Sequence, residues 1–521
     1  MLTPSYLLHA VEPAEEIAEQ LHTDIMARII ERILIRFQRG DDYILTATDK
    51  WQIETLQQAG FLLEDIQKEI VAATGKMEKE IAQAMEDASV RALEYDDAVY
   101  KAAGLDPVPL VQSPYLIQIM QRDFEATVGE WKNFTRISKQ AAHKLFVTAC
   151  DTAYHQAITG AISITQATKE AIDIAAEAGV YVEYKDEFGN VIRRDTIETA
   201  TTRAVRTGIS QASGNIQTAR MDEFNVDLVL VSSHMGARPE HAEWQGKIYS
   251  RSGAHEEYPD FVRSTRYGYV DGLCGANCRH NFGPWFEGME NPFEQYDSEE
   301  NQKQYELEQK QRTMERRIRD TKRKTMNWKT AMDHEEDPLK KALFESEYQR
   351  KAALLQKQNK AYNDFCKDND LKRRDDRIQI AKWDRKQAAQ AREAAKKHQK
   401  ELEKQQNFAK MEEEIREVAG LAKNASVHIP PERIFARGLS FDEKHINIER
   451  KHNVSNEMAI RWIEDSKASI TVWNGKFERY YGTNGAVYVD WEEKKIRTAF
   501  SGLEFDEKTL KVLEVLKKYG Y

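Results

Sequence analysis

Residues 299–420 contain one proline, Pro338, and one glycine, Gly420, which stands at the last position of the stretch. Lys, Glu, Gln, Arg and Ala dominate it, and all five residue types have high helix propensity. Apolar residues are sparse, and no a/d heptad is sustained over several turns, which argues against a coiled coil. The stretch therefore predicts long, partly solvated helices that lie on a partner.

Apolar side chains recur at four-residue steps in the N-terminal part of the chain, beginning with Ile17. This spacing places them on one face of a helix and predicts helices over residues 13–100. Three prolines between residues 107 and 114 mark a joint, after which helical spacing resumes over residues 115–178. We expect the apolar faces of this region to form a bundle core or a helix-docking face.

The hydrophobic period changes after residue 178. Residues 180–193 have the pattern of a β-hairpin, and a helix at about 196–223 and a strand at 227–231 are expected to follow it. From residue 232 to 292 the composition turns to Gly, Pro, His, Tyr and Trp. This composition indicates a compact, loop-rich module, which needs something besides a large core to stabilise it.

Residues 421–521 have the pattern of a small α+β domain. A helix is expected at 455–465 and a closing helix at 506–519, with four runs of strand-forming residues between them. Asn474-Gly475 lies between the first two runs and is the strongest short-range signal for a hairpin. The pattern predicts a four-stranded antiparallel sheet.

Together these patterns predict a mainly α chain with α+β modules. Its parts are a helical N-terminal region (1–112), an α+β core with a small loop-rich His/Cys module (113–298), a long charged helical connector (299–420) and a C-terminal α+β domain with a four-stranded antiparallel sheet (421–521). The chain is long enough for more than one hydrophobic core.

The formal net charge of −10 is unevenly distributed along the chain. Residues 1–300 contain 28 basic and 48 acidic side chains, residues 301–420 contain 31 and 23, and residues 421–521 contain 17 and 15. A uniformly basic nucleic-acid binder is excluded, although an acidic region can dock on a partner by charge complementarity. Residues 301–420 either lie against the phosphates of a nucleic acid or form an ordinary solvated helical face.

Several other classes of protein do not fit the sequence. Four cysteines are too few for a disulfide scaffold in 521 residues, which indicates a reducing compartment. The N-terminal residues lack the pattern of a signal peptide, and no apolar run approaches the roughly 18–20 residues of a membrane span. No phosphate-binding loop of the type Gly-x4-Gly-Lys-Ser/Thr occurs, which argues against an ATPase of the P-loop type.

Five histidines and cysteines within 47 residues form a candidate metal site. They are His234, His241, Cys274, Cys278 and His280. A Cys-x3-Cys-x-His motif with two upstream histidines supplies enough donors for a tetrahedral zinc ion. Because no HExxH-like spacing supplies a base, we expect a structural zinc ion as the cofactor. The alternative is that the thiols are small buried hydrophobes and the histidines bind loop carbonyls.

The same region resembles the phage minor capsid proteins, which are related to the Mu-F-type head morphogenesis proteins. The resemblance rests on residues 231–250 and on Gly272-Leu-Cys-Gly-Ala-Asn-Cys-Arg-His280, which ends in the Cys-Arg-His box of that family, and it extends over about residues 1–400. It implies a low-copy virion protein that is made in the host bacterial cytoplasm. Its expected partners are the portal and capsid proteins, and its expected place is the capsid interior.

A helix followed by a four-stranded antiparallel sheet, together with His445, Tyr480-Tyr481 and Ile496-Arg497-Thr498, is expected within residues 426–521. In these features that part of the chain resembles the barnase-like nuclease modules that are appended to phage head proteins and polymorphic toxins. The resemblance implies metal-independent ribonuclease activity on an RNA substrate. The residues expected to act as acid, base or phosphate ligand are His445, Arg450, Tyr480 and Thr498. The alternative for each is a surface or packing role. A toxin-like RNase effector, packaged in the virion and delivered with the genome, is the alternative function; a zinc-dependent hydrolase ranks last.

Overall fold

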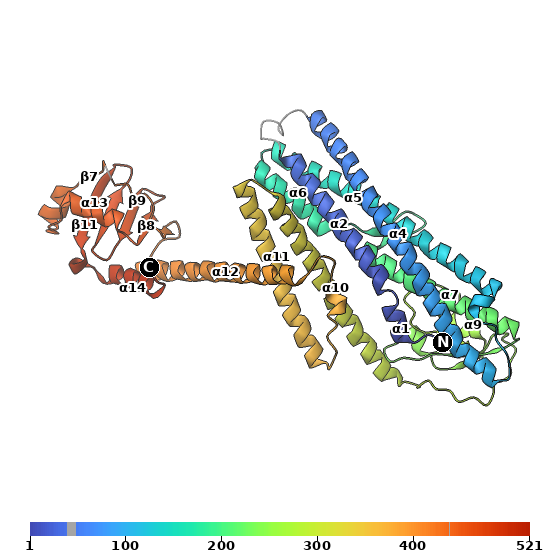
Figure 1. Cartoon of the computed structure of the whole chain (residues 1–521). Coiled ribbons are helices and arrows are strands. Elements are labelled where there is room, and N and C mark those ends of the chain that lie inside the picture. Colours follow the sequence, from blue (N-terminus) through green and yellow to red (C-terminus); the bar gives the residue numbers. More distant parts are fainter. Residues whose placement is uncertain (39–47, 437) are drawn as a thin grey trace. The chain divides into compact units, whose positions relative to one another are not determined.

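The computed structural model describes residues 1–38, 48–436 and 438–521. These residues form two compact units, Met1–Lys396 and Lys397–Tyr521. Each unit has its own buried apolar clusters. Figure 1 shows the helices and strands of both units. The fold is mainly α with α+β parts, which confirms the predicted fold class.

The first unit is built on a bundle of long helices. After the short α1 (Pro4–His9), these are α2 (Glu12–Phe37), α4 (Thr48–Ala102), α5 (Pro114–Ile158), α6 (Ile164–Ala178) and α7 (Ile197–Glu223), with the 3-10 turn η1 (Leu110–Gln112) between α4 and α5. The predicted stripe at four-residue steps forms the core of the bundle, since Ile25, Ile29 and Ile33 of α2 are fully buried. The prolines near residue 110 separate α4 from α5, as expected.

The charged stretch after residue 298 forms α10 (Ser298–His334), α11 (Pro338–Asp368) and α12 (Arg385–Ala419). Pro338 occupies the first turn of α11, where its missing N–H costs no hydrogen bond. α10 packs along α11 and against α2 and α6 (Figure 1). Its Ile318 and Trp328 side chains are fully buried in the core of the bundle. The predicted partner of α10 and α11 is therefore the N-terminal bundle of the same chain.

A buried group of charged side chains also holds α10 on the bundle. The Arg323 guanidinium donates to both carboxylate oxygens of Glu19, at 3.0 and 2.6 Å, and to Glu198 of α7. His22 lies 2.8 Å from the other Glu198 oxygen. Burial alone would raise the pKa of Glu198, but Arg323 and His22 hold it well below its ordinary value.

Two small sheets complete the first unit. The predicted hairpin is present as β1 (Val182–Lys185) and β2 (Val191–Asp195). The second sheet has the order β4-β3-β5, with β3 (Leu228–Val231) between β4 (Ile248–Ser250) and β5 (Phe282–Pro284). The loops of this sheet carry the short helices α8 (Pro239–Ala242) and α9 (Phe261–Thr265) and all five predicted metal ligands. This module therefore positions the candidate site.

The second unit contains a six-stranded sheet, so the prediction of four strands is wrong in number. The four predicted strands are present as β8 (Ala468–Val472), β9 (Phe477–Tyr481), β10 (Gly485–Asp490) and β11 (Lys495–Ser501). β6 (Ser426–His428) pairs with β8, and β7 (Ser440–Phe441) pairs in parallel with β11. These edge strands have three and two residues, which is too short for a recognisable alternation of apolar residues.

Helices cover both faces of this sheet. α13 (Asn456–Glu464) packs on the face that includes Tyr480, and α14 (Glu507–Lys518) packs on the face that includes Tyr481. The end of α12 joins the second cluster through Met411. The short helical turns are η3 (Lys444–Glu449), whose hydrogen bonds are of the π type, and η4 (Gly502–Glu504). Adjacent residues of one strand therefore contact different helices.

Gly485 is the point of closest approach between β10 and α13. A Cβ atom at this position would lie 2.3 Å from two ring atoms of the buried Trp462. We expect Gly485→Ala to destabilise the second unit by about 1–3 kcal/mol through overpacking. Hydrogen exchange of the full chain should show faster exchange in β10 and α13. As a control, Gly60→Ala on the exposed face of α4 should be neutral or stabilising, because nothing lies within 4 Å of its Cβ position. Unchanged exchange in Gly485→Ala would contradict the expectation.

Candidate metal centre

Three of the five predicted metal ligands converge in the small sheet module. His241 lies in α8, and Cys278 and His280 lie in the loop that leads into β5. The loop folds tightly because glycines stand where its backbone comes closest to other backbone atoms. A Cβ atom on Gly272 would stand 1.9 Å from a carbonyl oxygen, and one on Gly275 would stand 2.5 Å from another. These glycines allow the loop to present its thiol and imidazole to α8.

The donor atoms of the three residues form a compact triangle. The Nδ1 atoms of His241 and His280 are 3.4 Å apart, and the Cys278 Sγ atom is 3.7 Å from each. Each residue is only 1% exposed. A tetrahedral zinc ion, with bonds of about 2.0–2.1 Å to nitrogen and about 2.3 Å to sulfur, needs donors about 3.3–3.6 Å apart. The triangle therefore fits three corners of a zinc tetrahedron.

Hydrogen bonds on the outer nitrogens fix the protonation of both imidazoles. His241 Nε2 is 2.9 Å from the Asp271 carbonyl oxygen, which can only accept, so this nitrogen carries the proton. His280 Nε2 is 3.0 Å from Gln245 Oε1, an oxygen that also accepts from the backbone N–H of His234. Both Nδ1 atoms therefore keep a free lone pair, and the two lone pairs face each other. A cation bound between them would relieve this repulsion, which is the usual arrangement of histidines that bind a metal.

The surroundings keep both imidazoles neutral. Burial lowers the pKa of His241 to about 4 and lowers that of His280 well below its ordinary value. Neutral imidazole is the form that binds a metal. The same burial raises the pKa of the Cys278 thiol, whose sulfur accepts the backbone N–H of His280 at 3.4 Å. A bound cation would reverse that shift and stabilise the thiolate.

The other two predicted ligands lie beside the triangle. The ring of His234 stacks on the ring of His280, with centroids 4.4 Å apart, and its Nδ1 lies 3.0 Å from the Met235 carbonyl oxygen. Cys274 is buried in the apolar cluster of the module, with its Sγ 3.9 Å from the His280 carbonyl oxygen. Coordination by these two residues stays a prediction.

The two groups that orient the imidazoles were not predicted from the sequence. Gln245 contributes a side-chain oxygen, and Asp271 contributes only its backbone carbonyl. A glutamine four residues after a histidine is an unremarkable spacing, and a backbone carbonyl has no sequence signal at all. Both groups can be found only once the loop conformation is known.

The four residues predicted to be catalytic do not form one group. His445 lies in η3, 3.1 Å from Glu449, and Arg450 is exposed at the end of that turn. Tyr480 is buried on the α13 side of the sheet, where its hydroxyl donates to the Arg433 carbonyl oxygen at 3.2 Å. Tyr480 is paired with Val487 of β10, whereas Thr498 is paired with the next residue, Tyr488. Tyr480 and Thr498 therefore point to opposite faces of the sheet.

A bulge changes the expected alternation of β11 next to Thr498. The register shifts between Tyr488 and Val489 of β10, so that Arg497 is the extra residue on β11. Its guanidinium lies 2.8 Å from Glu493 and 3.4 Å from Asp442. This arginine is therefore occupied by carboxylates of its own unit.

Comparisons with known proteins identify one family. Residues 2–367 match the model of a family described as phage minor capsid protein 2. Neither the search of curated proteins nor that of solved structures gave a match. Among the residues that the structure describes, no helix is both long enough and apolar enough to span a membrane.

Proposed function

This chain belongs to the phage minor capsid protein 2 family, and from that membership we propose that it is a low-copy component of the phage head, associated with the portal and the capsid interior. As a member of this family it is a virion protein with a role in the capsid. The portal and capsid proteins are its proposed partners, and the host bacterial cytoplasm is its proposed place of synthesis.

The extent of the family match is the observation that carries this proposal. The match ends at residue 367, one residue before the end of α11, and includes the bundle, the small sheet module and the His/Cys triangle. All of these belong to the first compact unit, whereas residues 397–521 lie outside the match. We therefore assign the role in the head to the first unit and treat the second unit as an appended domain.

Analysis of purified phage particles tests the assignment. We expect the full chain in particles at a few copies, with chemical cross-links to the portal protein. Particles made with a chain that ends at residue 396 should still form and contain the shortened protein. Absence of the chain from purified particles would contradict a virion role. Failure of assembly with the shortened chain would show that the second unit takes part in assembly.

The His241, Cys278 and His280 triangle supports a structural zinc ion in the first unit. When bound, zinc supplies a fixed cross-link between α8 and the loop before β5. His241 and His280 would bind it through Nδ1, and Cys278 through its thiolate. Asp271 and Gln245 keep the imidazoles in the tautomer that binds. The predicted fourth donor is Cys274 or His234.

Binding of packaged DNA by residues 301–420 is a second proposal for the partners of the chain. Its support is the excess of basic side chains in that range. The paired charges of α10, such as Arg323 with Glu19, reduce the number available to phosphate. Binding of duplex DNA by the full chain should fall steeply as salt increases if the proposal is correct.

Ribonuclease activity of the second unit remains the alternative proposal, as part of an RNase effector delivered with the genome. The contact between His445 and Glu449 supports it, because a partly exposed histidine with a carboxylate partner can transfer protons. The separation of Tyr480 from Thr498 opposes a site made from all four predicted residues. The full chain and its His445→Ala variant should be incubated with tRNA. Cleavage that the variant loses supports the effector, and intact RNA contradicts it.

A further inference from the structure

A pocket of about 410 Å³ in the first unit lies directly beside the His/Cys triangle, with His241 and His280 in its wall. Nine arginines line it, whereas only two carboxylates, Glu15 and Glu315, do so. The arginines come from β2, α7, the small sheet module, α10 and the η2 turn (Asp376–Ile378). Such a concentration of one charge in a concave site attracts an ion of the opposite charge.

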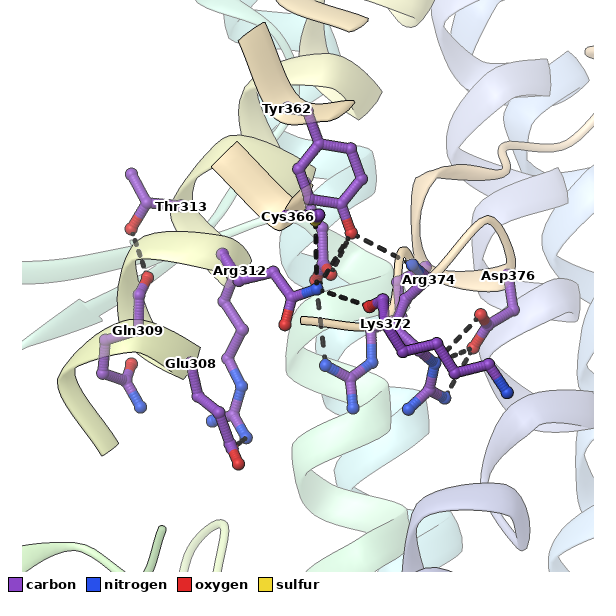
Figure 2. Close-up of polar contacts among 12 residues, drawn as sticks. Glu308, Gln309, Arg312, Thr313, Tyr362, Cys366, Lys372, Arg374 and Asp376 are labelled. Carbon is purple, nitrogen blue, oxygen red and sulfur yellow. Dashed lines mark hydrogen bonds and ion pairs between the residues drawn. The ribbon is translucent and has the colours of Figure 1, made fainter. Parts of the chain in front are cut away.

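Two carboxylates that pair with these arginines without lining the pocket, Asp195 and Glu308, do not neutralise them. Asp195 is shared by two of them, and Glu308 is shared by Arg279 at 3.5 Å and Arg312 at 3.2 Å. Figure 2 shows Glu308 and Arg312 together on α10. With Asp195 and Glu308 included, nine guanidinium groups face four carboxylates, an excess of five positive charges.

Four of the arginines form no ion pair with any carboxylate among residues 1–38, 48–436 and 438–521. Arg206 donates through Nε to the Leu7 carbonyl oxygen at 3.3 Å, and Arg238 donates to the Ala276 carbonyl oxygen at 2.6 Å. The other two are Arg316, which donates to Thr313 at 3.0 Å, and Arg319, which donates to the Arg377 carbonyl oxygen. Neutral oxygens satisfy donors but do not neutralise these guanidinium groups, of which Arg206 and Arg319 are opposed by the charge of Glu15.

The environment of Arg206 shows the effect of this crowding. Burial lowers its pKa to about 10, and Arg312 and Arg377 act in the same direction against the opposing charge of Glu15. At neutral pH the group is still protonated, and its two terminal nitrogens have no hydrogen-bond partner among the described residues. They are therefore free to bind an anion.

The polar contacts of α10 hold this wall in place without supplying further negative charge. The Tyr362 hydroxyl donates to Glu315 at 2.8 Å and accepts the backbone N–H of Arg374 at 3.2 Å. Tyr362 and Arg374 are visible at the junction of α11 with the 372–376 segment (Figure 2). A Glu315 carboxylate oxygen also lies 3.9 Å from a guanidinium nitrogen of Arg377, so its one charge is already paired with that arginine.

We propose that this pocket is a binding site for the phosphate groups of a small oligophosphate. Guanidinium groups match phosphate oxygens in pairs of parallel hydrogen bonds, and several converging arginines suit an anion with several charges. The volume is that of a small-molecule site. The phosphate chemistry has two possible sources, a free nucleoside polyphosphate and the phosphorylated end of a nucleic-acid strand. The proposal does not depend on the role in the phage head.

Calorimetry of the full, zinc-supplied chain with pyrophosphate tests this site. We expect saturable binding, weakened about tenfold or more in Arg206→Gln and in Arg319→Gln, because each loses charged hydrogen bonds to the anion. Arg316→Gln changes an exposed side chain and provides a variant that should fold without difficulty. Arg350→Gln is the matched control, since Arg350 lies on α11 outside the pocket and pairs with Glu347.

Competition experiments identify the source of the phosphate. If a nucleoside triphosphate competes with pyrophosphate, the ligand is a free nucleotide. If only a 5′-phosphorylated oligonucleotide competes, and its 5′-hydroxyl form does not, the ligand is the phosphorylated end of a strand. Pyrophosphate should also raise the melting temperature of the unchanged chain by more than it raises that of Arg206→Gln. No binding at millimolar pyrophosphate would overturn the proposal, as would equal weakening in Arg350→Gln.

Discussion

Cys278→Ser is expected to lose stoichiometric zinc and to melt at a temperature about 4–8 °C below that of the unchanged chain. Serine removes the softest of the three donors and leaves two imidazole lone pairs 3.4 Å apart. When the free zinc concentration is about a thousand times the dissociation constant, binding stabilises the folded chain by about 4 kcal/mol. The variant loses that amount. Metal analysis of the purified protein and a thermal melt measure the two effects.

Cys150→Ser is the matched control for this experiment. Cys150 is also fully buried, but it lies in α5 within the helical bundle. Its variant should keep zinc even where the new hydroxyl lowers stability. A chelator should bring the unchanged chain to the melting temperature of Cys278→Ser. Absence of zinc from the unchanged chain, or equal loss of zinc from both variants, would contradict the assignment.

The zinc-free chain should lose stability as the pH falls from about 6.5 to about 4. The pKa of His241 is near 4 in the folded chain, and an unfolded histidine has a pKa of about 6.5. Between these values the unfolded chain binds the additional proton, so stability rises with pH across this interval. Denaturation with urea at several pH values measures the slope.

Arg323→Met is expected to lower the free energy of unfolding of the first unit by about 3–5 kcal/mol. The substitution keeps much of the volume of the side chain but leaves Glu19 and Glu198 buried without their cation. Their side chains are 7% and 2% exposed, so water cannot replace the guanidinium. The midpoint of urea denaturation and hydrogen exchange in α10 measure the loss.

Two further variants identify the cause of this loss. Arg350→Met removes an exposed arginine that pairs with Glu347 on the same helix, and it should cost about 1 kcal/mol or less. Glu198→Gln in the Arg323→Met background should restore part of the stability by removing an unpaired charge. If Arg323→Met were as mild as Arg350→Met, the buried charges would not be what holds α10 on the bundle.

The pH dependence of these variants follows from Glu198. Its pKa is lowered in the folded chain, so its stabilising effect is complete above the ordinary carboxyl pKa of about 4.3 and disappears as the pH falls. Arg323→Met should lose less stability than the unchanged chain on acidification, because the main cause of the lowered pKa is gone.

Long periodic segments were the most predictable part of the fold. The stripe that begins at Ile17 and the stretch that contains Pro338 are both largely helical, as predicted, because helix propensity and side-chain spacing are local properties. The short strands β6 and β7 were missed, since two or three residues carry no period. The sequence also did not identify the surface on which α10 packs, because that depends on charges as distant as Glu19 and Arg323.

The candidate site was predicted in its residue types but not in its geometry. Spacing in the chain identified His241, Cys278 and His280, and the folded loop brought them together. The arginines of the pocket range from residue 193 to residue 377, so no local pattern connects them. They converge through the packing of β2, α7, the small sheet module, α10 and η2.

The composition of the bundle core also determines when the core can form. One apolar cluster includes Leu7 near the start of the chain, Trp328 of α10 and Trp383 before α12. A ribosome that adds about 5–20 residues per second needs roughly 5–20 s to extend a chain from the end of the small sheet module to the last of these residues. During that interval the N-terminal helices have been made, but the part of their apolar surface that α10 and α11 cover is still exposed. Completion of the core must therefore wait for the charged helices, which are the last part of the first unit to leave the ribosome.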